Sequence, residues 1–217
     1  MIVHAIIAVR GGPSAKTRCA SILTSQQRNA LIIAMVKDMV AALAAVRQSC
    51  RVHIVTPTRE IAGLAVDLGA EPIFEPVPAG VNAAFETARR HVSADAPGDR
   101  LILLPGDLPL ISPEDVRCAI LEHDWSMLGV VPANDGGTSA LMLSAGMPIV
   151  PRFGNYSARA HRSAARAAGI GVATRYLPSF ACDIDRPIDL EWLRDEASPS
   201  RAGNYLRSLG TRKDRVA

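Results

Sequence analysis

The sequence has few aromatic residues, a small net charge and no long apolar run. Aromatic residues make up 4% of the 217 residues, which leaves little material for stacking single-stranded bases. The net charge is +3, and part of the basic character lies in residues 201–215, where it favours a solvated tail over a nucleic-acid-binding arm. No uninterrupted apolar run reaches the roughly 18 residues of a membrane span. The sequence therefore predicts no nucleic-acid partner and no membrane span.

Cysteine is sparse and scattered. Cys19, Cys50, Cys118 and Cys182 form no CxxC pair, and no histidine stands at zinc-finger spacing from them, so neither a structural disulfide nor a zinc site is expected. The apolar opening, residues 1–9, lacks the basic region and the small-residue cleavage site of a signal peptide. We therefore expect a reduced, cytoplasmic protein.

One folded domain accounts for most of the chain. Hydrophobic residues make up 48% and charged residues 21%, close to the averages of soluble globular domains, and the length suits a single domain. Beyond Pro199 the composition turns polar and basic. We expect a single domain over residues 1–197, followed by a basic C-terminal tail, residues 198–217, that is poorly ordered or makes a subunit contact.

Short apolar runs alternate with amphipathic stretches along nearly the whole chain. This alternation is typical of α/β proteins, in which helices cover a mostly parallel sheet. The predicted strands are Ile2–Val9, Arg51–Thr56, Pro72–Phe74, Leu101–Leu104, Met127–Val131, Ala140–Leu143 (antiparallel), Val172–Tyr176 and Ala181–Ile184. The predicted helices are Ser25–Val46 with Ser25 as N-cap, Thr58–Leu68, Val81–His91, 113–123, Ser157–Ala168 and Arg186–Arg194.

Two polar loops follow predicted strands. One begins at Arg10, directly after the first strand, and the other holds Asp107, shortly after Leu104. In open α/β sheets ligands bind beyond the carboxyl ends of the strands. We therefore expect the two loops to be neighbours in one crevice.

The first of these loops contains cations and glycines. Arg10, Gly11, Gly12, Lys16 and Arg18 lie within nine positions. Glycines let a polyphosphate approach backbone N–H groups, while lysine and arginine neutralise its charge. The spacing fits neither a GxGxxG nor a Walker A motif. A phosphate site and a solvated basic loop are both compatible with this segment taken alone.

Three aspartates stand at the ends of predicted strands. Asp183 and Asp185 form an Asp-x-Asp unit, in which an extended backbone points both carboxylates to one side. Mg²⁺ typically takes one or two protein carboxylates and completes its shell with water and phosphate oxygens. A lone Asp-x-Asp is commonly a turn or a cap, but together with Asp107 and the cationic loop we interpret it as a Mg²⁺ site.

Two further polar segments lie in the second half of the chain. Thr138 and Ser139 close a polar turn, and Gly154 and Ser157 lead into a helix that carries His161. A helix N-terminus offers free N–H groups to an anion, and the hydroxyls add hydrogen-bond donors. Two ordinary turns, with His161 in a capping or packing role, are the alternative interpretation.

In this order, the motifs resemble those of the 2-phospholactate guanylyltransferase family, nucleotidyltransferases of coenzyme F420 biosynthesis that include members acting on phosphoenolpyruvate. The resemblance extends to about residue 194. It is carried by Arg10 and Lys16-Thr17-Arg18-Cys19, by Gly80 to Ala84 (GVNAA), by Gly106 to Ser112 (GDLPLIS), by Gly137-Thr138, by Phe153-Gly154 with Ser157 and His161, and by Asp183 to Leu190 (DIDRPIDL). Arg10-Gly11 replaces the family's usual Lys-Pro, and Cys19 replaces a common Leu.

The resemblance implies a Rossmann-like three-layer α/β sandwich of the nucleotide-diphospho-sugar transferase, or glycosyltransferase-A, type. It implies that Lys16 and three metal-binding aspartates are catalytic, and that other residues bind the nucleotide and the acid. The implied metal ligands are Asp107, Asp183 and Asp185. The implied nucleotide-binding residues are Arg10, Gly11, Gly12, Lys16, Arg18 and Asn82, and the implied acid-binding residues are Thr138, Ser139, Gly154, Ser157 and His161.

The reaction implied is transfer of GMP from GTP, with Mg²⁺, to the phosphate of a small phosphorylated carboxylic acid, with release of pyrophosphate. The acceptors 2-phospholactate, phosphoenolpyruvate and 3-phosphoglycerate stay open, because they differ by groups worth only about 1–3 kcal/mol in a pocket. Transfer to a molybdenum cofactor or a sugar phosphate, and non-catalytic nucleotide binding, are the alternatives. A homodimer also stays open, because the Met and Leu stripe of the first long helix fits either a core or a dimer face.

Overall fold

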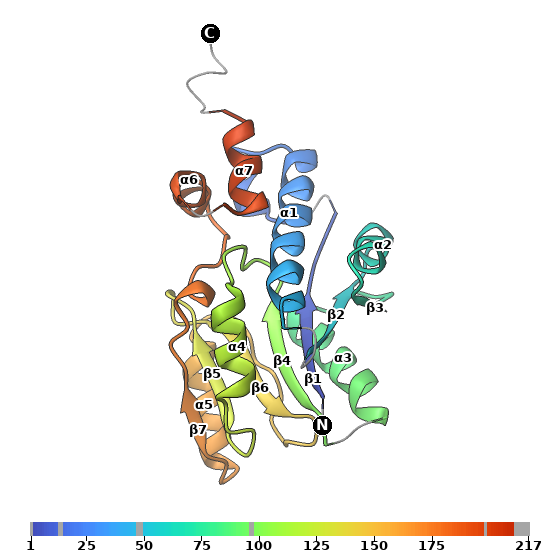
Figure 1. Cartoon of the computed structure of the whole chain (residues 1–217), viewed down its shortest axis with the longest axis vertical. Coiled ribbons are helices and arrows are strands. Elements are labelled where there is room, and N and C mark those ends of the chain that lie inside the picture. Colours follow the sequence, from blue (N-terminus) through green and yellow to red (C-terminus); the bar gives the residue numbers. More distant parts are fainter. Residues whose placement is uncertain (1, 13–14, 47–49, 96–97, 198, 211–217) are drawn as a thin grey trace.

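The computed structural model describes residues 2–12, 15–46, 50–95, 98–197 and 199–210. They form a seven-stranded sheet of order β3-β2-β1-β4-β6-β5-β7 (Figure 1). The strands are β1 (Val3–Ala8), β2 (Cys50–Thr56), β3 (Glu71–Phe74), β4 (Arg100–Pro105), β5 (Leu128–Pro132), β6 (Thr138–Ser144) and β7 (Val172–Thr174). Strands β1 to β4 are parallel, and β6 is antiparallel to both β4 and β5. The expected α/β fold with a mixed sheet is confirmed.

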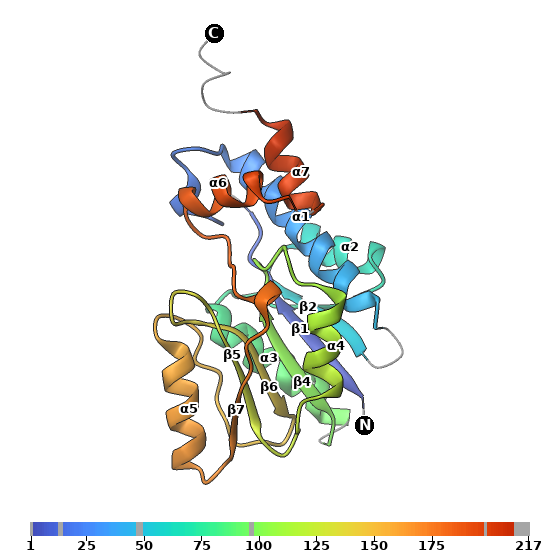
Figure 2. The ribbon, with the colours of Figure 1, turned by 60° about the vertical axis from the view of Figure 1, so that its left-hand side comes forward.

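Helices cover both faces of this sheet (Figures 1 and 2). They are α1 (Ser25–Ala44), α2 (Arg59–Asp67), α3 (Val81–Asp95), α4 (Pro113–Leu121), α5 (Ser157–Ala167), α6 (Pro187–Asp195) and α7 (Arg201–Ser208), with 3-10 turns at Thr17–Cys19 and Pro178–Phe180. None of the described helices is long and apolar enough to cross a membrane.

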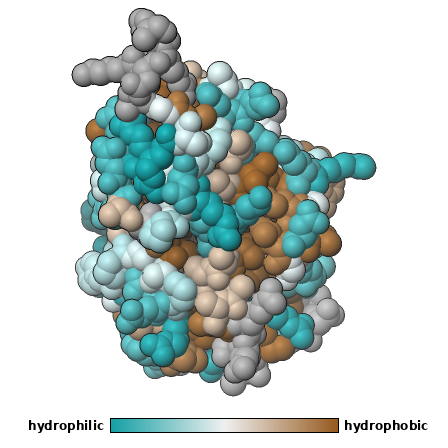
Figure 3. Space-filling view, turned by 45° about the horizontal axis from the view of Figure 1, so that its top comes forward, coloured by the Kyte–Doolittle hydropathy of each residue, from teal (hydrophilic) through white to brown (hydrophobic). Residues whose placement is uncertain are grey.

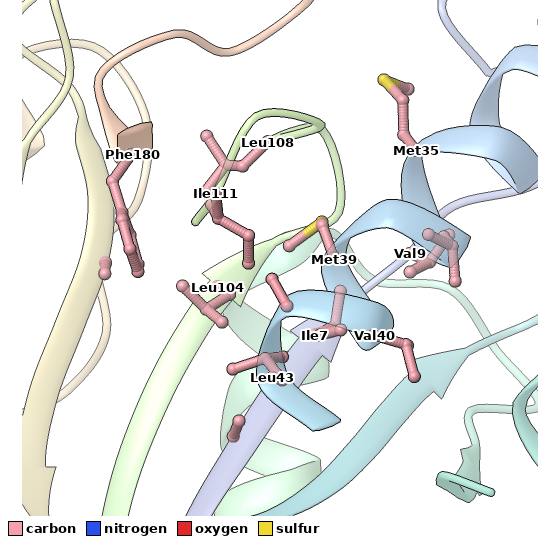
Figure 4. Close-up of a cluster of buried hydrophobic side chains, with 14 of the residues drawn as sticks. Ile7, Val9, Met35, Met39, Val40, Leu43, Leu104, Leu108, Ile111 and Phe180 are labelled. Carbon is pink, nitrogen blue, oxygen red and sulfur yellow. The ribbon is translucent and has the colours of Figure 1, made fainter. Parts of the chain in front are cut away.

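The alternation of side chains along β4 divides the core into two layers. Ile102 and Leu104 belong to the cluster under α1 and α4, whereas Leu101 and Leu103 belong to the cluster under α3 and α5, because successive strand residues point to opposite faces. Figure 4 shows the first cluster, with Met39 and Leu43 of α1 near Ile7 of β1 and Leu104. The Met and Leu stripe of α1 is therefore part of the core.

The start of α1 differs by one residue from the sequence-based expectation. The N-cap is Thr24 and not Ser25. The Thr24 hydroxyl accepts a hydrogen bond from the backbone N–H of Gln27 at 3.2 Å, and the Gln27 side chain accepts one from the N–H of Thr24 at 2.9 Å. This reciprocal capping box satisfies two of the otherwise free N–H groups of the helix.

Residues 181–184, predicted as a strand, do not join the sheet. Instead the segment crosses the carboxyl ends of the central strands. The N–H of Ile184 donates to the carbonyl of Asp107 at 3.1 Å, and the carbonyl of Ala181 accepts from the N–H of Asn134 at 3.3 Å. Ile184 is buried where the segment crosses the ends of the strands, and this path brings Asp183 and Asp185 to the loop after β4.

The expectation of a C-terminal tail is wrong for residues 201–208, which form α7 beside α1 (Figure 1). Ala202 and Leu206 are buried, and Asp38 of α1 accepts hydrogen bonds at 2.9 Å from the N–H groups of Arg201 and Ala202. Two buried apolar positions four residues apart make too weak a pattern to recognise in a basic sequence. Residues 211–217 lie outside the described residues.

Candidate active site

Lys16 bridges two carboxylates that are distant in sequence. Its Nζ donates hydrogen bonds to Oδ2 of Asp107 at 2.7 Å and to Oδ1 of Asp185 at 2.6 Å. Arg18 adds a longer contact, 3.4 Å from Nη1 to Oδ2 of Asp185. The loops after β1 and β4 and the segment before α6 therefore meet beyond the carboxyl ends of the strands, and the first two are the neighbours that the sequence predicts.

The loop that carries Lys16 is held from inside the protein. The buried guanidinium of Arg28, on α1, donates to the carbonyls of Ala15 at 3.0 Å and of Leu23 at 2.9 Å. Lys16 itself has a left-handed backbone conformation, with φ of 51°. The thiol of Cys19 donates to the carbonyl of Asp185 at 3.4 Å. These contacts hold the Lys16 loop against the segment before α6.

The charges of these groups depend on one another. Burial alone would lower the pKa of Lys16, but the carboxylates of Asp107 and Asp185 raise it above its ordinary value. Burial works against ionisation of Asp185 as well, yet the Lys16 ammonium keeps the pKa of that carboxyl below its usual range. Burial, together with the negative charge of Asp107, raises the pKa of Asp183 to about 6. Lys16 is therefore positively charged. Asp183 differs from Asp185, because the charges that act most strongly on it are those of other carboxylates and favour its protonated form.

The carboxylates offer chemistry that suits a hard cation. Oδ1 of Asp107 is buried and has no hydrogen-bond partner among the described residues. Carboxylate oxygens are the ligands that Mg²⁺ prefers, so the donors of Asp107, Asp183 and Asp185 fit this ion. In the described part of the chain, however, no three His, Cys, Asp or Glu side chains converge as a metal site. The position between Asp107 and Asp185 belongs to Lys16 Nζ.

A cleft of about 550 Å³ opens from Lys16 toward β1, β2 and β3. We call it the β1–β3 cleft. Its lining includes Arg10, Lys16, Arg18, Pro57, Glu75, Pro78, Gly80, Val81, Asp107 and Asp185. Figure 3, which is turned toward the carboxyl ends of the parallel strands, shows an apolar area bordered by hydrophilic residues. This cleft combines cations at one end with apolar walls.

A second cleft of about 650 Å³ opens between the starts of α5 and α6. We call it the α5–α6 cleft. Its lining includes Arg18, Asn134, Asp135, Asn155, Tyr156, Asp183, Asp185, Arg186 and Trp192. Arg18 and Asp185 line both clefts. Ligands in the two clefts would thus meet at the carboxylates.

Gly11 and Gly12, predicted to let a phosphate approach the backbone, instead make contacts that hold the loop in place. A Cβ on Gly11 would lie 2.9 Å from Cγ1 of Ile61, so only glycine allows this close approach to α2. Gly12 has a positive φ of 87°, and its N–H donates to Oδ1 of Asn29 at 3.2 Å. Arg10 is exposed and lines the β1–β3 cleft. Arg10, rather than the backbone of Gly12, is therefore the part of this segment that is open to the cleft.

Asn82, predicted to contact the nucleotide, has its carboxamide occupied by backbone. Nδ2 donates to the carbonyl of Phe153 at 3.1 Å, and Oδ1 accepts from the N–H of Phe153 at 2.6 Å. Asn82 thereby joins the start of α3 to the loop that contains Gly154. In this structure it positions that loop.

Three of the predicted acid-binding residues form a buried hydrogen-bonded chain. Nε2 of His161 accepts from the N–H of Arg152 at 2.8 Å, which leaves the ring proton on Nδ1, 3.0 Å from Oγ1 of Thr138. Ser157 donates to the same oxygen at 2.9 Å. Burial, followed by the charge of Arg152, lowers the pKa of His161 to about 4, so the ring is neutral. His161 is fully buried and has the packing role that the sequence leaves open.

The other two predicted acid-binding residues lie apart from this chain. Ser139 points to the opposite face of β6, and its buried Oγ has no partner among the described residues. Gly154 is exposed and has a φ of 136°. The α5–α6 cleft is also lined by Asp135 and Tyr156, and the β1–β3 cleft by Glu75, residues to which sequence reasoning assigned no role. An acid directly after a predicted strand is the signal that could have found Glu75.

The fold has close relatives among solved structures. A protein from Desulfovibrio desulfuricans G20, assigned to the nucleotide-diphospho-sugar transferases, superposes with a TM-score of 0.76 over 96% of this chain and 95% of that chain, at 20% identity. This likeness concerns the fold. Together with two clefts that share Arg18 and Asp185, and with its sequence relatives, it defines the protein as a nucleotidyltransferase.

Sequence relatives narrow this class to one family. Residues 3–215 match the family described as guanylyl transferase CofC like, and the chain belongs to that family. A 3-phospho-D-glycerate guanylyltransferase of Phenylobacterium zucineum (strain HLK1) is 42% identical over 216 residues, which cover 97% of this chain and 98% of that protein. A phosphoenolpyruvate guanylyltransferase of Mycobacterium ulcerans (strain Agy99) is 31% identical over 192 residues, 87% of this chain and 86% of that protein. The family expected from the sequence motifs is confirmed.

Proposed function

We propose that this protein transfers GMP from GTP to the phosphate of 3-phosphoglycerate and releases pyrophosphate, as a step of coenzyme F420 biosynthesis. The observation that carries the proposal is that Asp185, which lines both clefts, is joined through Lys16 to Asp107 in the β1–β3 cleft. One cleft suits a nucleotide and the other a small acid, so both phosphates would lie beside the same charged groups.

The choice of acid is supported by the relative named for 3-phospho-D-glycerate, which matches nearly the full chain at 42% identity. Relatives named for phosphoenolpyruvate match at 31–32%. Phosphoenolpyruvate and 2-phospholactate are therefore the competing acceptors, and an assay has to include both.

The chemistry needs alignment and charge neutralisation more than proton transfer. A phosphate monoester is largely a dianion near neutrality, because its second pKa is about 6. Its oxygen attacks the α-phosphorus of GTP, a new P–O bond forms, and the bond to the β-phosphate breaks as pyrophosphate leaves in line. Two anions repel each other, so holding them together is the main task of the site. The Lys16 ammonium supplies a fixed positive charge at that place.

We assign the remaining roles by position. Arg10 and Arg18 neutralise phosphate oxygens of the nucleotide from the β1–β3 cleft. Asp107, Asp183 and Asp185 would be the residues that hold Mg²⁺, which when bound would neutralise phosphate charge and assist departure of pyrophosphate.

The acid lies in the α5–α6 cleft near the start of α5, where Arg186 lines the cleft and supplies positive charge for an anion. The backbone of the exposed Gly154 contacts it, whereas Thr138 and Ser157 support the start of α5 from inside the protein, and Ser139, on the opposite face of β6, takes no part. His161 keeps Thr138 in place, and Asn82 does the same for the loop of Gly154.

Pyrophosphate release tests this proposal. Purified protein is given GTP and Mg²⁺ with 3-phosphoglycerate, phosphoenolpyruvate, 2-phospholactate, a sugar 1-phosphate or no acid, and the series is repeated with ATP and CTP. We expect release with GTP and 3-phosphoglycerate above every other pair. Preference for another phospho-acid would replace the acceptor, and release only with a sugar phosphate would contradict the proposed function.

A further inference from the structure

Glu75 is a buried acidic residue that lines the β1–β3 cleft. It follows β3 directly, and its N–H continues the sheet by donating to the carbonyl of Thr56 at 2.9 Å. The residue is only 7% exposed, yet no hydrogen bond or ion pair within the described residues engages its side chain. Glu75 lines the β1–β3 cleft, so its carboxylate is open to a ligand that donates hydrogen bonds.

The position of Glu75 fits the base of a nucleotide. Strand β3 lies three strands from β4 (Figure 1), so Glu75 stands about 14 Å from the loop of Asp107, at a spacing of about 4.8 Å per strand. A nucleotide with its phosphates at Lys16 extends over such a distance. Pro57, Pro78 and Val81 supply apolar wall between the two ends. This arrangement suits a flat base whose polar edge reaches Glu75.

We propose that the Glu75 carboxylate accepts hydrogen bonds from N1–H and the 2-amino group of guanine, and thereby selects GTP. The inference deepens the proposed function, on which it rests. An ionised carboxylate is an acceptor only, and these two groups are neighbouring donors on guanine. Adenine places the lone pair of N1 at the same point, where it would face the carboxylate oxygens. Selection therefore works both by attraction of guanine and by repulsion of adenine.

Inosine triphosphate, which lacks only the 2-amino group, isolates half of this recognition. Direct binding and kcat/KM are measured for GTP, inosine triphosphate and ATP with wild type and with Glu75→Ala. A hydrogen bond to a charged acceptor corresponds to a preference of about 10- to 100-fold. We expect wild type to prefer GTP over inosine triphosphate by about this factor and Glu75→Ala to lose the preference. An unchanged ratio in the variant would overturn the inference.

A change of specificity provides a test that loss of stability cannot imitate. Glu75→Gln offers one acceptor and one donor, which match N1–H and the 2-oxo group of xanthine. We expect this variant to prefer xanthosine triphosphate over GTP, whereas wild type prefers GTP. Thermal unfolding of both variants checks the fold, and Glu114→Gln, on an exposed residue that lines neither cleft, is the matched control.

The ribose is the other group that Glu75 could bind, and 2′-deoxy-GTP separates the two cases. If Glu75 bound the ribose, its variants would bind GTP and ATP equally less tightly, and they would no longer prefer GTP over 2′-deoxy-GTP. That result would overturn base recognition. Direct binding needs no acceptor. A wild type that binds GTP selectively but releases no pyrophosphate with any acid would therefore refute the proposed function and leave the role of Glu75 intact.

Discussion

Acid should destabilise this protein through the buried ring of His161. Both ring nitrogens are engaged, Nε2 by the N–H of Arg152 and Nδ1 by Thr138. Burial lowers the pKa of the ring from an ordinary 6.5 to about 4. The unfolded chain therefore binds more protons than the folded one between these two values, and the free energy of unfolding falls as the pH decreases below about 6.5.

The magnitude follows from the two pKa values. A difference of one in pKa corresponds to 1.36 kcal/mol, so the complete effect is about 3 kcal/mol. Between pH 7 and pH 5 the contribution of His161 to stability decreases by about 2 kcal/mol. That is a large part of the stability of a typical domain, and it would be read as a shift of the urea midpoint.

Urea unfolding at pH 7, 6 and 5 measures this effect. His161→Gln removes the titrating ring, so we expect the variant to lose about 2 kcal/mol less than wild type between pH 7 and pH 5, whatever its stability at pH 7. His91→Gln, on the exposed side of α3, is the matched control and should follow wild type. Identical pH dependence of wild type and His161→Gln would refute the reasoning.

Three other substitutions test the site and the fold. Asp107→Asn should lower kcat by about 100-fold or more, with little change in Tm, because asparagine keeps the shape and Asp185 still neutralises Lys16. Lys16→Met should destabilise the fold at pH 7 by about 1–3 kcal/mol, since two partly buried carboxylates lose their counter-charge, and should also reduce kcat/KM. Leu206→Ala should cost about 2–4 kcal/mol of unfolding free energy and keep the KM for GTP. Calorimetry and pyrophosphate release provide these measurements.

Each of these expectations has a clear contrary outcome. Wild-type turnover by Asp107→Asn would reject its place in the metal site, and Asp67→Asn, exposed on α2, is its control. A Lys16→Met protein as stable as wild type would show that the carboxylates need no counter-ion. A Leu206→Ala protein of unchanged Tm would mean that α7 contributes nothing to the core.

The strands of the sheet, and the proximity of two loops that are distant in the sequence, could be predicted from the sequence. Buried strands are continuous apolar runs, so Ile2–Val9 and Leu101–Leu104 could be recognised, and the rule that ligands bind beyond the carboxyl ends placed Asp107 near Lys16. The antiparallel strand Thr138–Ser144 could be predicted for a similar reason, because a polar turn precedes it.

The rest depends on partners that no local pattern reveals. The apolar residues of 181–184 look like a strand, but only Ile184 is buried, where the segment crosses the ends of the central strands. Asn82 carries no mark of its bonds to Phe153, and His161 has the same local pattern whether it packs or binds. The N–H of Gly12 is already taken by Asn29, a residue of α1. In each case a side chain finds its partner only after the chain has folded.

The bridge made by Lys16 bears on whether the folded protein needs a metal ion for its stability. The ammonium is tethered to the backbone, so the positive charge between Asp107 and Asp185 is present at every concentration of free divalent ion. These two carboxylates therefore have a counter-ion when magnesium is scarce, and the folded state does not require the metal to balance them. In the proposed reaction magnesium would arrive with the triphosphate, so its supply would limit turnover but not the amount of folded protein.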